Sequence, residues 1–286
     1  MEIAIISGKG GTGKSSITAA FATAGREVVL ADCDVDAANM HLIMHPEIEE
    51  TFVYVSGEKA LIDRNLCSGC SLCYDVCRFN AVFVEDGKYH VDKIACDGCR
   101  LCSRVCPENA IKITKSDKSR MLSGSFRNGK MVYGRLEPGE ENSGKLVAMV
   151  RDKCREVSKK TGTGTILIDA PPGIGCPVIS SITGTDKLLI VTEPSVSGFS
   201  DLKRTLELIS SFRIKHSVII NKYDLCPSLS DEIENYCHAC NIEISGKLPF
   251  DPDVVTAMIN CKSIVEWRPD SLVSKILIDI WQQITD

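Results

Sequence analysis

Short apolar runs alternate with longer segments of helical periodicity along most of the chain. The runs at 3–6, 165–168 and 187–191 consist mainly of Ile, Leu and Val and lack strict polar–apolar alternation. Such runs are typical of parallel strands that helices cover on both faces. The pattern therefore predicts an α/β fold with a doubly wound, mostly parallel sheet.

The middle of the chain breaks this pattern. Residues 60–114 lack long apolar runs and are rich in cysteine. After them, polar–apolar alternation and several glycines predict a hairpin that returns to the sheet, followed by a helix from about Ser143. We therefore expect a discontinuous α/β domain, 1–59 and 115–286, with a small α+β domain inserted at 60–114.

Composition and charge narrow the classes of function that this chain could have. The chain has 286 residues, a net charge of −5 and 15 cysteines. The charge gives no indication of a nucleic-acid partner. No apolar run reaches membrane-spanning length and the N-terminus reads as a strand, so we expect a cytoplasmic protein. In that setting the cysteines favour metal ligation over disulfides.

The first strand leads into a phosphate-binding pattern. Gly8 to Ser15 match G-x-x-x-x-G-K-[ST], whose backbone amides cradle phosphates at a helix N-terminus. Lys14 should reach the β- and γ-phosphates, and the Ser15 hydroxyl should bind Mg²⁺. The residues expected to bind nucleotide here are Gly8, Gly10, Gly11, Thr12, Gly13, Lys14, Ser15 and Ser16.

The loop contains a second lysine, Lys9. The segment "KGGTGK" resembles the deviant Walker A loop of the MinD, ParA, Mrp and nitrogenase iron protein group. The resemblance implies ATP as the nucleotide and an ATP-dependent homodimer in which Lys9 reaches the partner's nucleotide. It also implies that Asp34 is the hydrolytic aspartate and that Asp32 helps to hold Mg²⁺ through water, and Asp36 remains open for either role.

Two later segments extend this resemblance. "GTILIDAPPGIG" is similar to a Walker B strand joined to the second switch, which implies that Asp169 binds the Mg²⁺ shell and that the Gly173 amide senses the γ-phosphate. The segments "NKYD" and "LPFDPD" resemble adenine-contacting elements of the group. They imply base contacts from Asn221, Pro249 and Asp251.

The cysteine region contains the run C-x2-C-x2-C-x3-C twice, offset by 29 residues. This is the spacing of bacterial two-cluster ferredoxins, in which the fourth cysteine of each run ligates the other 4Fe-4S cluster. A zinc ribbon is the alternative, but zinc gains nothing from a third cysteine in each run. The predicted sets are Cys67, Cys70, Cys73 and Cys106 for cluster I, and Cys96, Cys99, Cys102 and Cys77 for cluster II.

The whole pattern resembles MinD-like ATPases with an inserted ferredoxin domain. Three functions follow from it. The first is an ATPase that uses Lys9, Lys14, Asp34 and Asp169 to couple nucleotide state to electron transfer toward a protein redox partner. The second is an iron–sulfur cluster carrier, with Cys237 and Cys240 of "CHAC" as ligands of a labile cluster. The third is a positioning ATPase of the MinD or ParA kind with a redox sensor.

The C-terminal segment has apolar residues at helical spacing. On a membrane-targeting helix the polar face would be basic, but only Lys275 is available here, against Asp279 and Asp286. We therefore expect this helix to dock on its own domain and to provide no direct membrane anchor. The apolar stripe is Leu272, Ile276, Ile280 and Ile284.

Overall fold

The protein is described by a computed structural model that covers residues 1–25, 27–140 and 143–285. The chain forms two compact units. The first comprises residues 1–51, 121–134 and 144–286, and the second comprises residues 52–120 and 135–143. The second unit thus includes all of 60–114 and a separate, later stretch of chain.

A nine-stranded sheet organises the first unit, in the order β13-β12-β11-β1-β10-β2-β9-β8-β3. The pairings from β13 through to β9 are parallel. This confirms the predicted α/β fold with a mostly parallel sheet. The strands are β1 Glu2–Ile6, β2 Val28–Asp32, β3 Glu47–Tyr54, β8 Ser119–Phe126, β9 Gly129–Arg135, β10 Ile166–Asp169, β11 Lys187–Thr192, β12 Lys215–Asn221 and β13 Glu243–Leu248.

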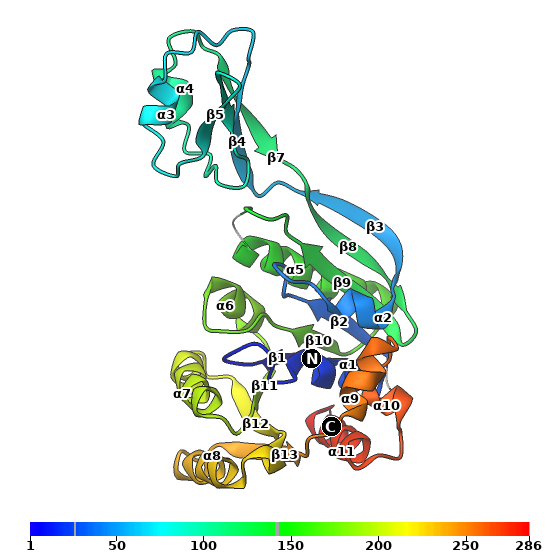
Figure 1. Cartoon of the computed structure of the whole chain (residues 1–286). Helices are drawn as coiled ribbons and strands as arrows, with labels where there is room; N and C mark the ends of the chain where they lie inside the picture. The colour runs from blue at the N-terminus through cyan, green and yellow to red at the C-terminus, as the bar shows by residue number, and fades with distance from the viewer. Residues whose placement is uncertain (26, 141–142, 286) are drawn as a thin grey trace. The chain divides into compact units, whose positions relative to one another are not determined.

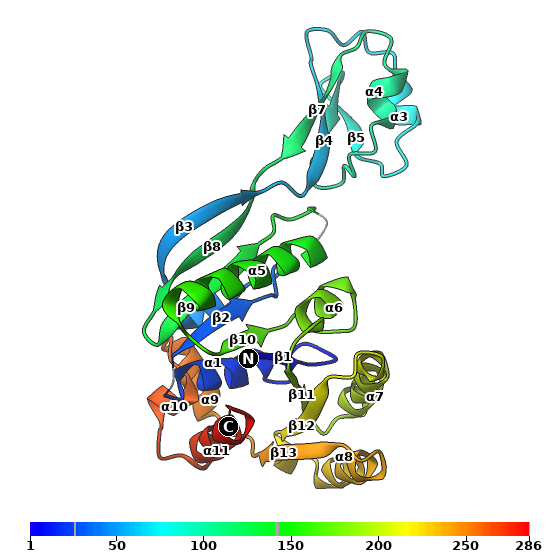
Figure 2. The ribbon, with the colours of Figure 1, turned by 180° about the vertical axis from the view of Figure 1, so that it is seen from behind.

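Helices cover both faces of this sheet. Helices α5 to α8 lie on one face, and α1, α9, α10 and α11 lie on the other (Figures 1 and 2). Their bounds are α1 Lys14–Thr23, α2 Met40–Met44, α5 Ser143–Thr161, α6 Cys176–Ile182, α7 Val196–Ser210, α8 Pro227–Ala239, α9 Asp253–Ile259, α10 Ile264–Trp267 and α11 Leu272–Thr285, and a 3₁₀ turn, η1, spans Tyr223–Leu225. The predicted hairpin is formed by β8 and β9, and the predicted helix from Ser143 is α5.

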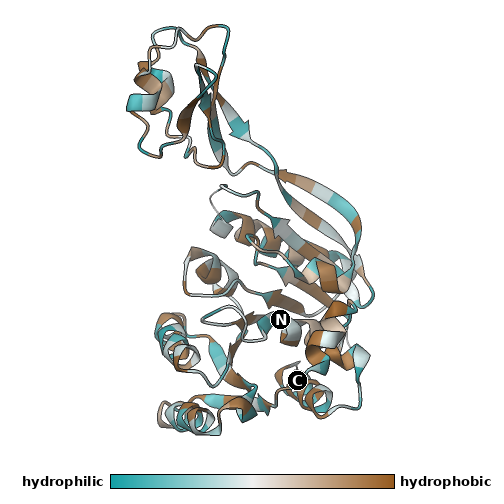
Figure 3. Ribbon diagram, in the orientation of Figure 1, coloured by the Kyte–Doolittle hydropathy of each residue, from teal (hydrophilic) through white to brown (hydrophobic). Residues whose placement is uncertain are grey.

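In the core, apolar strands pack against these helices. The hydropathy colouring shows hydrophobic residues along the central strands and both hydrophobic and hydrophilic residues along the helices (Figure 3). Helix α11 buries Leu277, Ile280 and Trp281, and the Trp281 ring stacks on Phe21 of α1 at 5.2 Å between centroids. The C-terminal helix therefore docks on its own domain, as predicted, although Leu272 of the predicted stripe is exposed. Within the described residues no helix is long and apolar enough to cross a membrane.

The second unit contains two small antiparallel sheets and two short helices. Strands β4 (Gly57–Ile62) and β7 (Ile111–Ser116) form one sheet, and β5 (Val82–Glu85) and β6 (Lys88–Val91) form the other. Helices α3 (Leu72–Asp75) and α4 (Leu101–Val105) each follow one C-x2-C segment. Its apolar cluster includes Cys73 and Cys96, so cysteines occupy positions that aliphatic side chains fill in an ordinary core.

Candidate functional site

The predicted phosphate loop connects β1 to α1 and adopts a backbone that requires glycine. Gly11 and Gly13 have φ of 85° and 93°, a region that L side chains rarely adopt. A Cβ on Gly13 would lie 2.3 Å from Asn221 Nδ2, and one on Gly8 would lie 2.5 Å from Asp201 Cβ. The loop is therefore held closely between neighbouring segments, and it leads directly into the N-terminus of α1.

Asp169 joins the loop to the sheet. Strand β10 pairs with both β1 and β2, so Asp169 ends beside Ile5 and Asp32. Its carboxylate accepts hydrogen bonds from Lys14 Nζ at 2.8 Å and from Ser15 Oγ at 2.8 Å. Thr18 Oγ1 also donates to it at 2.8 Å. The structure thus brings together the three residues that the sequence predicted around Mg²⁺ and phosphate, Lys14, Ser15 and Asp169.

Asp32 and Asp34 form an acidic pair at the same edge of the sheet. Asp32 is fully buried and accepts hydrogen bonds from the amides of Asp34 and Met40, each at 3.1 Å. Burial, with the charge of Asp169 added, raises the pKa of Asp32 to about 7. Burial also raises the pKa of Asp34, which is half-buried. Carboxyls that resist ionisation in this way are suited to a cation, whose charge favours the ionised form.

Lys9 is bound within its own chain. Its Nζ lies 2.8 Å from Glu193 Oε1 and donates to Ser195 Oγ at 3.0 Å and Ser197 Oγ at 2.9 Å. Burial opposes the ionised form of Glu193, but hydrogen bonds from Lys9 and Lys222 outweigh it and lower the pKa. In this single chain Lys9 is therefore anchored to the segment between β11 and α7.

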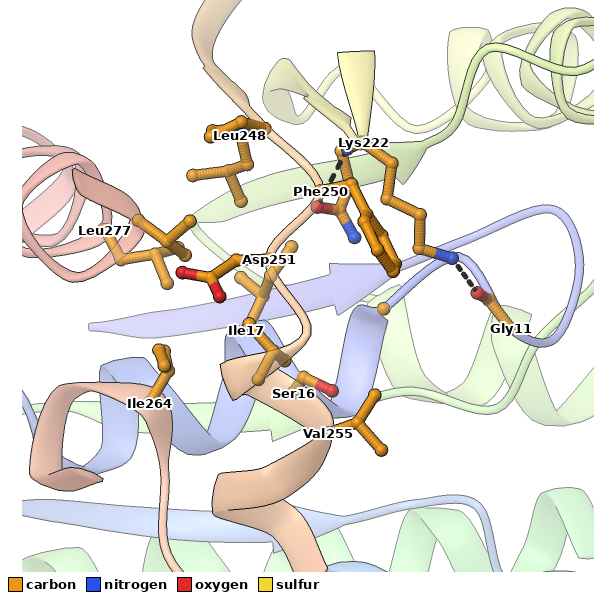
Figure 4. Close-up of a pocket in the computed structure, with 15 residues that line it drawn as sticks. Gly11, Ser16, Ile17, Lys222, Leu248, Phe250, Asp251, Val255, Ile264 and Leu277 are labelled. Carbon is orange, nitrogen blue, oxygen red and sulfur yellow. Dashed lines mark hydrogen bonds between the residues drawn. The ribbon is translucent and has the colours of Figure 1, made fainter. Parts of the chain in front are cut away.

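The three predicted base-contacting residues line one cavity with the phosphate loop. The cavity has an empty volume of about 660 Å³, and its wall includes Asn221, Pro249 and Asp251 beside Gly11 and Ser16. Apolar residues of α1, α10 and α11 close its inner end, and Lys222 reaches Gly11 across its mouth, with Nζ 3.0 Å from the carbonyl (Figure 4). A planar base with a polar edge fits such a cavity.

Two further predicted positions belong to this site. The Gly173 amide donates to the Ser7 carbonyl at 2.9 Å, so the segment predicted to be the second switch is tied to the residue just before the phosphate loop. The buried hydroxyl of Thr12 has no hydrogen-bond partner among the described residues. A buried polar atom without a partner usually marks a place for a ligand or water.

The eight predicted cysteine ligands line two separate cavities in the second unit. One is lined by Cys67, Cys70, Cys73 and Cys106. The other is lined by Cys77, Cys96, Cys99 and Cys102. Each cavity therefore receives three cysteines from one run and the fourth from the other run, which is the predicted grouping.

The backbone conformation repeats at the same offset of 29 residues as the cysteines. Gly69 and Gly98 have φ of 77° and 70°, and Asn80 and Asn109 both have φ of 49°. The amides of Ala81 and Ala110 donate to the Sγ atoms of Cys77 and Cys106, each at 3.3 Å. The second unit is thus duplicated in conformation as well as in sequence.

Throughout residues 1–25, 27–140 and 143–285, no three or more His, Cys, Asp or Glu side chains converge closely enough to hold a single metal ion. The four cysteines of each cavity are distributed around its wall. Burial raises the pKa of Cys73 and of Cys102, and a metal centre would favour their thiolates.

The "CHAC" pair occupies different environments. Cys237 is fully buried in α8, where burial raises its pKa to about 11, and Cys240 is exposed just after the helix. Cys237 behaves as a packing residue of the core.

Sequence reasoning missed Thr18, Glu193 and Lys222. Thr18 could have been found as a polar residue one turn after Lys14 on the buried side of a helix. Glu193 follows a buried parallel strand, where ligand-binding carboxylates are common. Lys222 adjoins the predicted Asn221 but carries no signal of its own.

Comparison with known proteins gives matches over nearly the whole chain. The family model of the CobQ/CobB/MinD/ParA nucleotide-binding domain matches residues 3–264. The protein MJ0578 of Methanocaldococcus jannaschii is 32% identical, in an alignment that covers 100% of this chain and 97% of that protein. An iron–sulfur cluster carrier protein of Aquifex aeolicus is 26% identical over 130 residues, 40% of this chain and 35% of that protein.

Solved structures match the fold. The cell division ATPase MinD of Pyrococcus furiosus has a TM-score of 0.60 with 18% identity, covering 100% of this chain and 98% of that one. At this identity the likeness concerns the fold alone.

Proposed function

This chain belongs to the CobQ/CobB/MinD/ParA family of nucleotide-binding domains, and we propose that it is an ATPase that couples its nucleotide state to electron transfer through two 4Fe-4S clusters. One observation carries the proposal. In a single chain, a phosphate loop bound to Asp169 occurs with two cavities that each present four cysteines. Nucleotide binding alone would give no reason for the second feature.

The nucleotide site contains a residue for each requirement of phosphoryl transfer. Lys14 would bind the β- and γ-phosphates, and Ser15, Asp169 and Asp32 would hold Mg²⁺, which neutralises charge on the phosphate oxygens. Asp34 would orient the attacking water. ATP must displace Lys14 and Ser15 from Asp169, so binding rearranges the loop and the end of β10 together.

The dimer is part of the proposal. Lys9 would leave Glu193 and reach the nucleotide of the partner chain in the ATP-bound state. Because Gly173 is tied to Ser7 at the base of the loop, movement there would also move the second switch.

The cysteine cavities fit the predicted grouping of ligands for two clusters, Cys67, Cys70, Cys73 and Cys106 for cluster I, and Cys96, Cys99, Cys102 and Cys77 for cluster II. When bound, such clusters supply one-electron transfer at potentials set by their surroundings. The surrounding apolar residues limit water, and the Ala81 and Ala110 amides stabilise negative charge on sulfur. The second unit would then be a ferredoxin-like domain.

The test begins with anaerobic purification and measurement of iron, sulfide and bound zinc. We expect about eight irons per chain, from two four-iron clusters. Coupling is measured as the rate at which a water-soluble chelator removes this iron with MgATP or MgADP present. The two rates should differ in the wild type and be equal in Lys14→Ala. Colourless, iron-free protein, or protein that holds zinc, would refute the cluster assignment, whereas equal rates in the wild type would refute only the coupling.

A cluster carrier is the second candidate, and the similarity to the Aquifex aeolicus carrier protein favours it. A carrier must release its cluster, so the loaded protein should pass ⁵⁵Fe-labelled cluster to an apo-ferredoxin within minutes. Retention of the label throughout would exclude this candidate. The burial of Cys237 argues against "CHAC" as the release site.

A further inference from the structure

The second unit is pseudo-symmetric in its cysteines but not in its charges. Lys59 and Lys88 are separated by the 29 residues that separate equivalent cysteines. Ala60, next to Lys59, lines the cavity of cluster II, and its repeat partner Tyr89, next to Lys88, lines the cavity of cluster I. The two lysines are therefore placed alike with respect to the two cavities.

Their surroundings differ. Lys88 is exposed, whereas Lys59 is only 8% exposed. Lys59 Nζ donates to the carbonyl of Cys96 at 2.8 Å and to the carbonyl of Gly139 at 2.7 Å. Among the described residues no carboxylate forms an ion pair with it. A buried ammonium with only neutral partners is costly unless an anion lies nearby.

Residues 135–140, which we call the strap, provide one of the two carbonyls that Lys59 contacts. The strap precedes α5 and belongs to the second unit. The Glu140 carboxylate accepts hydrogen bonds from Ser56, just before β4, and from Ser116, at the end of β7. Gly139 has φ of 78°, and a Cβ there would lie 2.7 Å from the Ile94 carbonyl. This close packing of Gly139 brings its carbonyl within hydrogen-bond distance of Lys59. The strap lies outside the cysteine repeat, so the repeat itself does not give Lys88 an equivalent contact.

The other charges near the two cavities are exposed or paired, and they include Arg78, which follows the cluster II ligand Cys77 and is exposed. Asp97 lines the cavity of cluster II and Glu108 that of cluster I, and both carboxylates are exposed. Arg100 also lines the cavity of cluster II, but it forms an ion pair with Glu58. Lys59 differs from these charges because it is buried and contacts the backbone of the ligand Cys96.

We propose that Lys59 is a tuning residue that raises the reduction potential of cluster II above that of cluster I. A cluster held by four thiolates carries net negative charge, and reduction adds one electron without a proton. A positive charge of low exposure stabilises the reduced form more than the oxidised form, and solvent screens it less than it screens the exposed Lys88. Lys88 is hydrated and screened, so its effect on cluster I is small. The inference rests on the cluster assignment above and deepens it, since an electron that reaches either cluster would settle on cluster II.

The test is an anaerobic potentiometric titration followed by electron paramagnetic resonance. Lys59→Met removes the charge and keeps the apolar stem, and Lys88→Met is its repeat-matched control. We expect two midpoints in the wild type and, in Lys59→Met, a fall of the higher one by at least a tenfold change in equilibrium, about 59 mV for one electron. The gap between the midpoints therefore narrows. Lys88→Met should shift either midpoint by less than a third of that amount.

Several outcomes would overturn the proposal. They are unchanged midpoints in Lys59→Met, a gap that widens because the lower midpoint falls, or an equal shift in Lys88→Met. Lys59→Gln, which keeps an amide donor, serves if the Met variant does not fold. If both neutral variants lose iron while Lys59→Arg keeps it, Lys59 is structural and the tuning role is wrong. Wild-type protein without iron and sulfide would instead refute the cluster assignment itself.

Discussion

Lys9 and Glu193 are 184 positions apart in the chain, yet Lys9 Nζ lies 2.8 Å from Glu193 Oε1. The contact exists because β1 and β11 are adjacent parallel strands whose carboxyl ends meet at one edge of the sheet. It holds, within its own chain, the lysine that the family resemblance assigns to the partner's nucleotide. In the dimer proposed above, this ion pair would have to break.

Glu193→Gln should therefore favour dimerisation. A partly exposed ion pair contributes up to about 1 kcal/mol, and each of the two chains would break one, so the proposed ATP-dependent dimer should form at up to roughly 30-fold lower protein concentration. Sedimentation velocity with MgATP measures this shift. Ser197→Ala, which removes a neutral partner of Lys9, should have a smaller effect. If Glu193→Gln weakens dimerisation instead, Glu193 acts in the dimer rather than against it.

Gly13→Ala should destabilise the nucleotide-free protein. The positive φ and the 2.3 Å approach to Asn221 both oppose a Cβ at this position. A strained backbone position of this kind costs on the order of 1–3 kcal/mol. Gly10→Ala is the matched control, because a Cβ on Gly10 meets nothing within 4 Å. Urea unfolding of both variants without nucleotide makes the comparison, and equal midpoints would contradict the strained loop.

Asp32 should make stability depend on pH. Its pKa of about 7 in the folded protein lies above the ordinary value of 3.8, so the folded state binds the proton more tightly. The stability of the nucleotide-free protein should therefore fall as pH rises from about 4 to about 7 and then level off. Asp32→Asn should remove this dependence.

The expected difference is large enough to measure. At about 1.4 kcal/mol per pKa unit, the wild type should lose roughly 2–3 kcal/mol more than Asp32→Asn between pH 5 and pH 8. Urea unfolding of both proteins at these pH values gives the result. Parallel pH profiles would show that Asp32 ionises normally in the folded protein.

Cys99→Ser should reduce the iron content from about eight to about four per chain, because one of the two proposed cubes loses a ligand. Cys240→Ser is the control, since both thiols are exposed and only Cys99 lines a cysteine cavity. Iron analysis of anaerobically purified protein distinguishes them. Loss of iron in Cys240→Ser would point to the carrier function instead.

The sequence predicted those features that depend on residues close together in the chain. The runs around Ile5 and Ile168 are apolar enough to require burial on both faces, and the glycines after β1 permit only a tight loop. The parallel pairing of β10 with β2 then brings Asp32 beside Asp169. The cysteine spacing likewise predicted which four cysteines share each cavity.

Contacts between distant segments were not predictable in this way. Glu193 is one acidic residue among many until β11 is known to lie beside β1. Lys59 and Lys88 are equivalent in the repeat, and only the packing of Gly139 distinguishes them. The strap also belongs to the second unit although it lies outside residues 60–114. Its Glu140 carboxylate accepts hydrogen bonds from the hydroxyls of Ser56 and Ser116.

The strap determines which fragment of this chain would contain the whole second unit. A fragment cut out as one continuous piece, residues 52–120, would leave behind residues 135–140, which follow two intervening strands of the other unit. Its β4–β7 sheet would lose the Glu140 carboxylate, and Lys59 would meet water instead of the Gly139 carbonyl. The cysteine unit is thus built from two separate pieces of the chain, and a single continuous insertion would not transfer the whole unit to another protein.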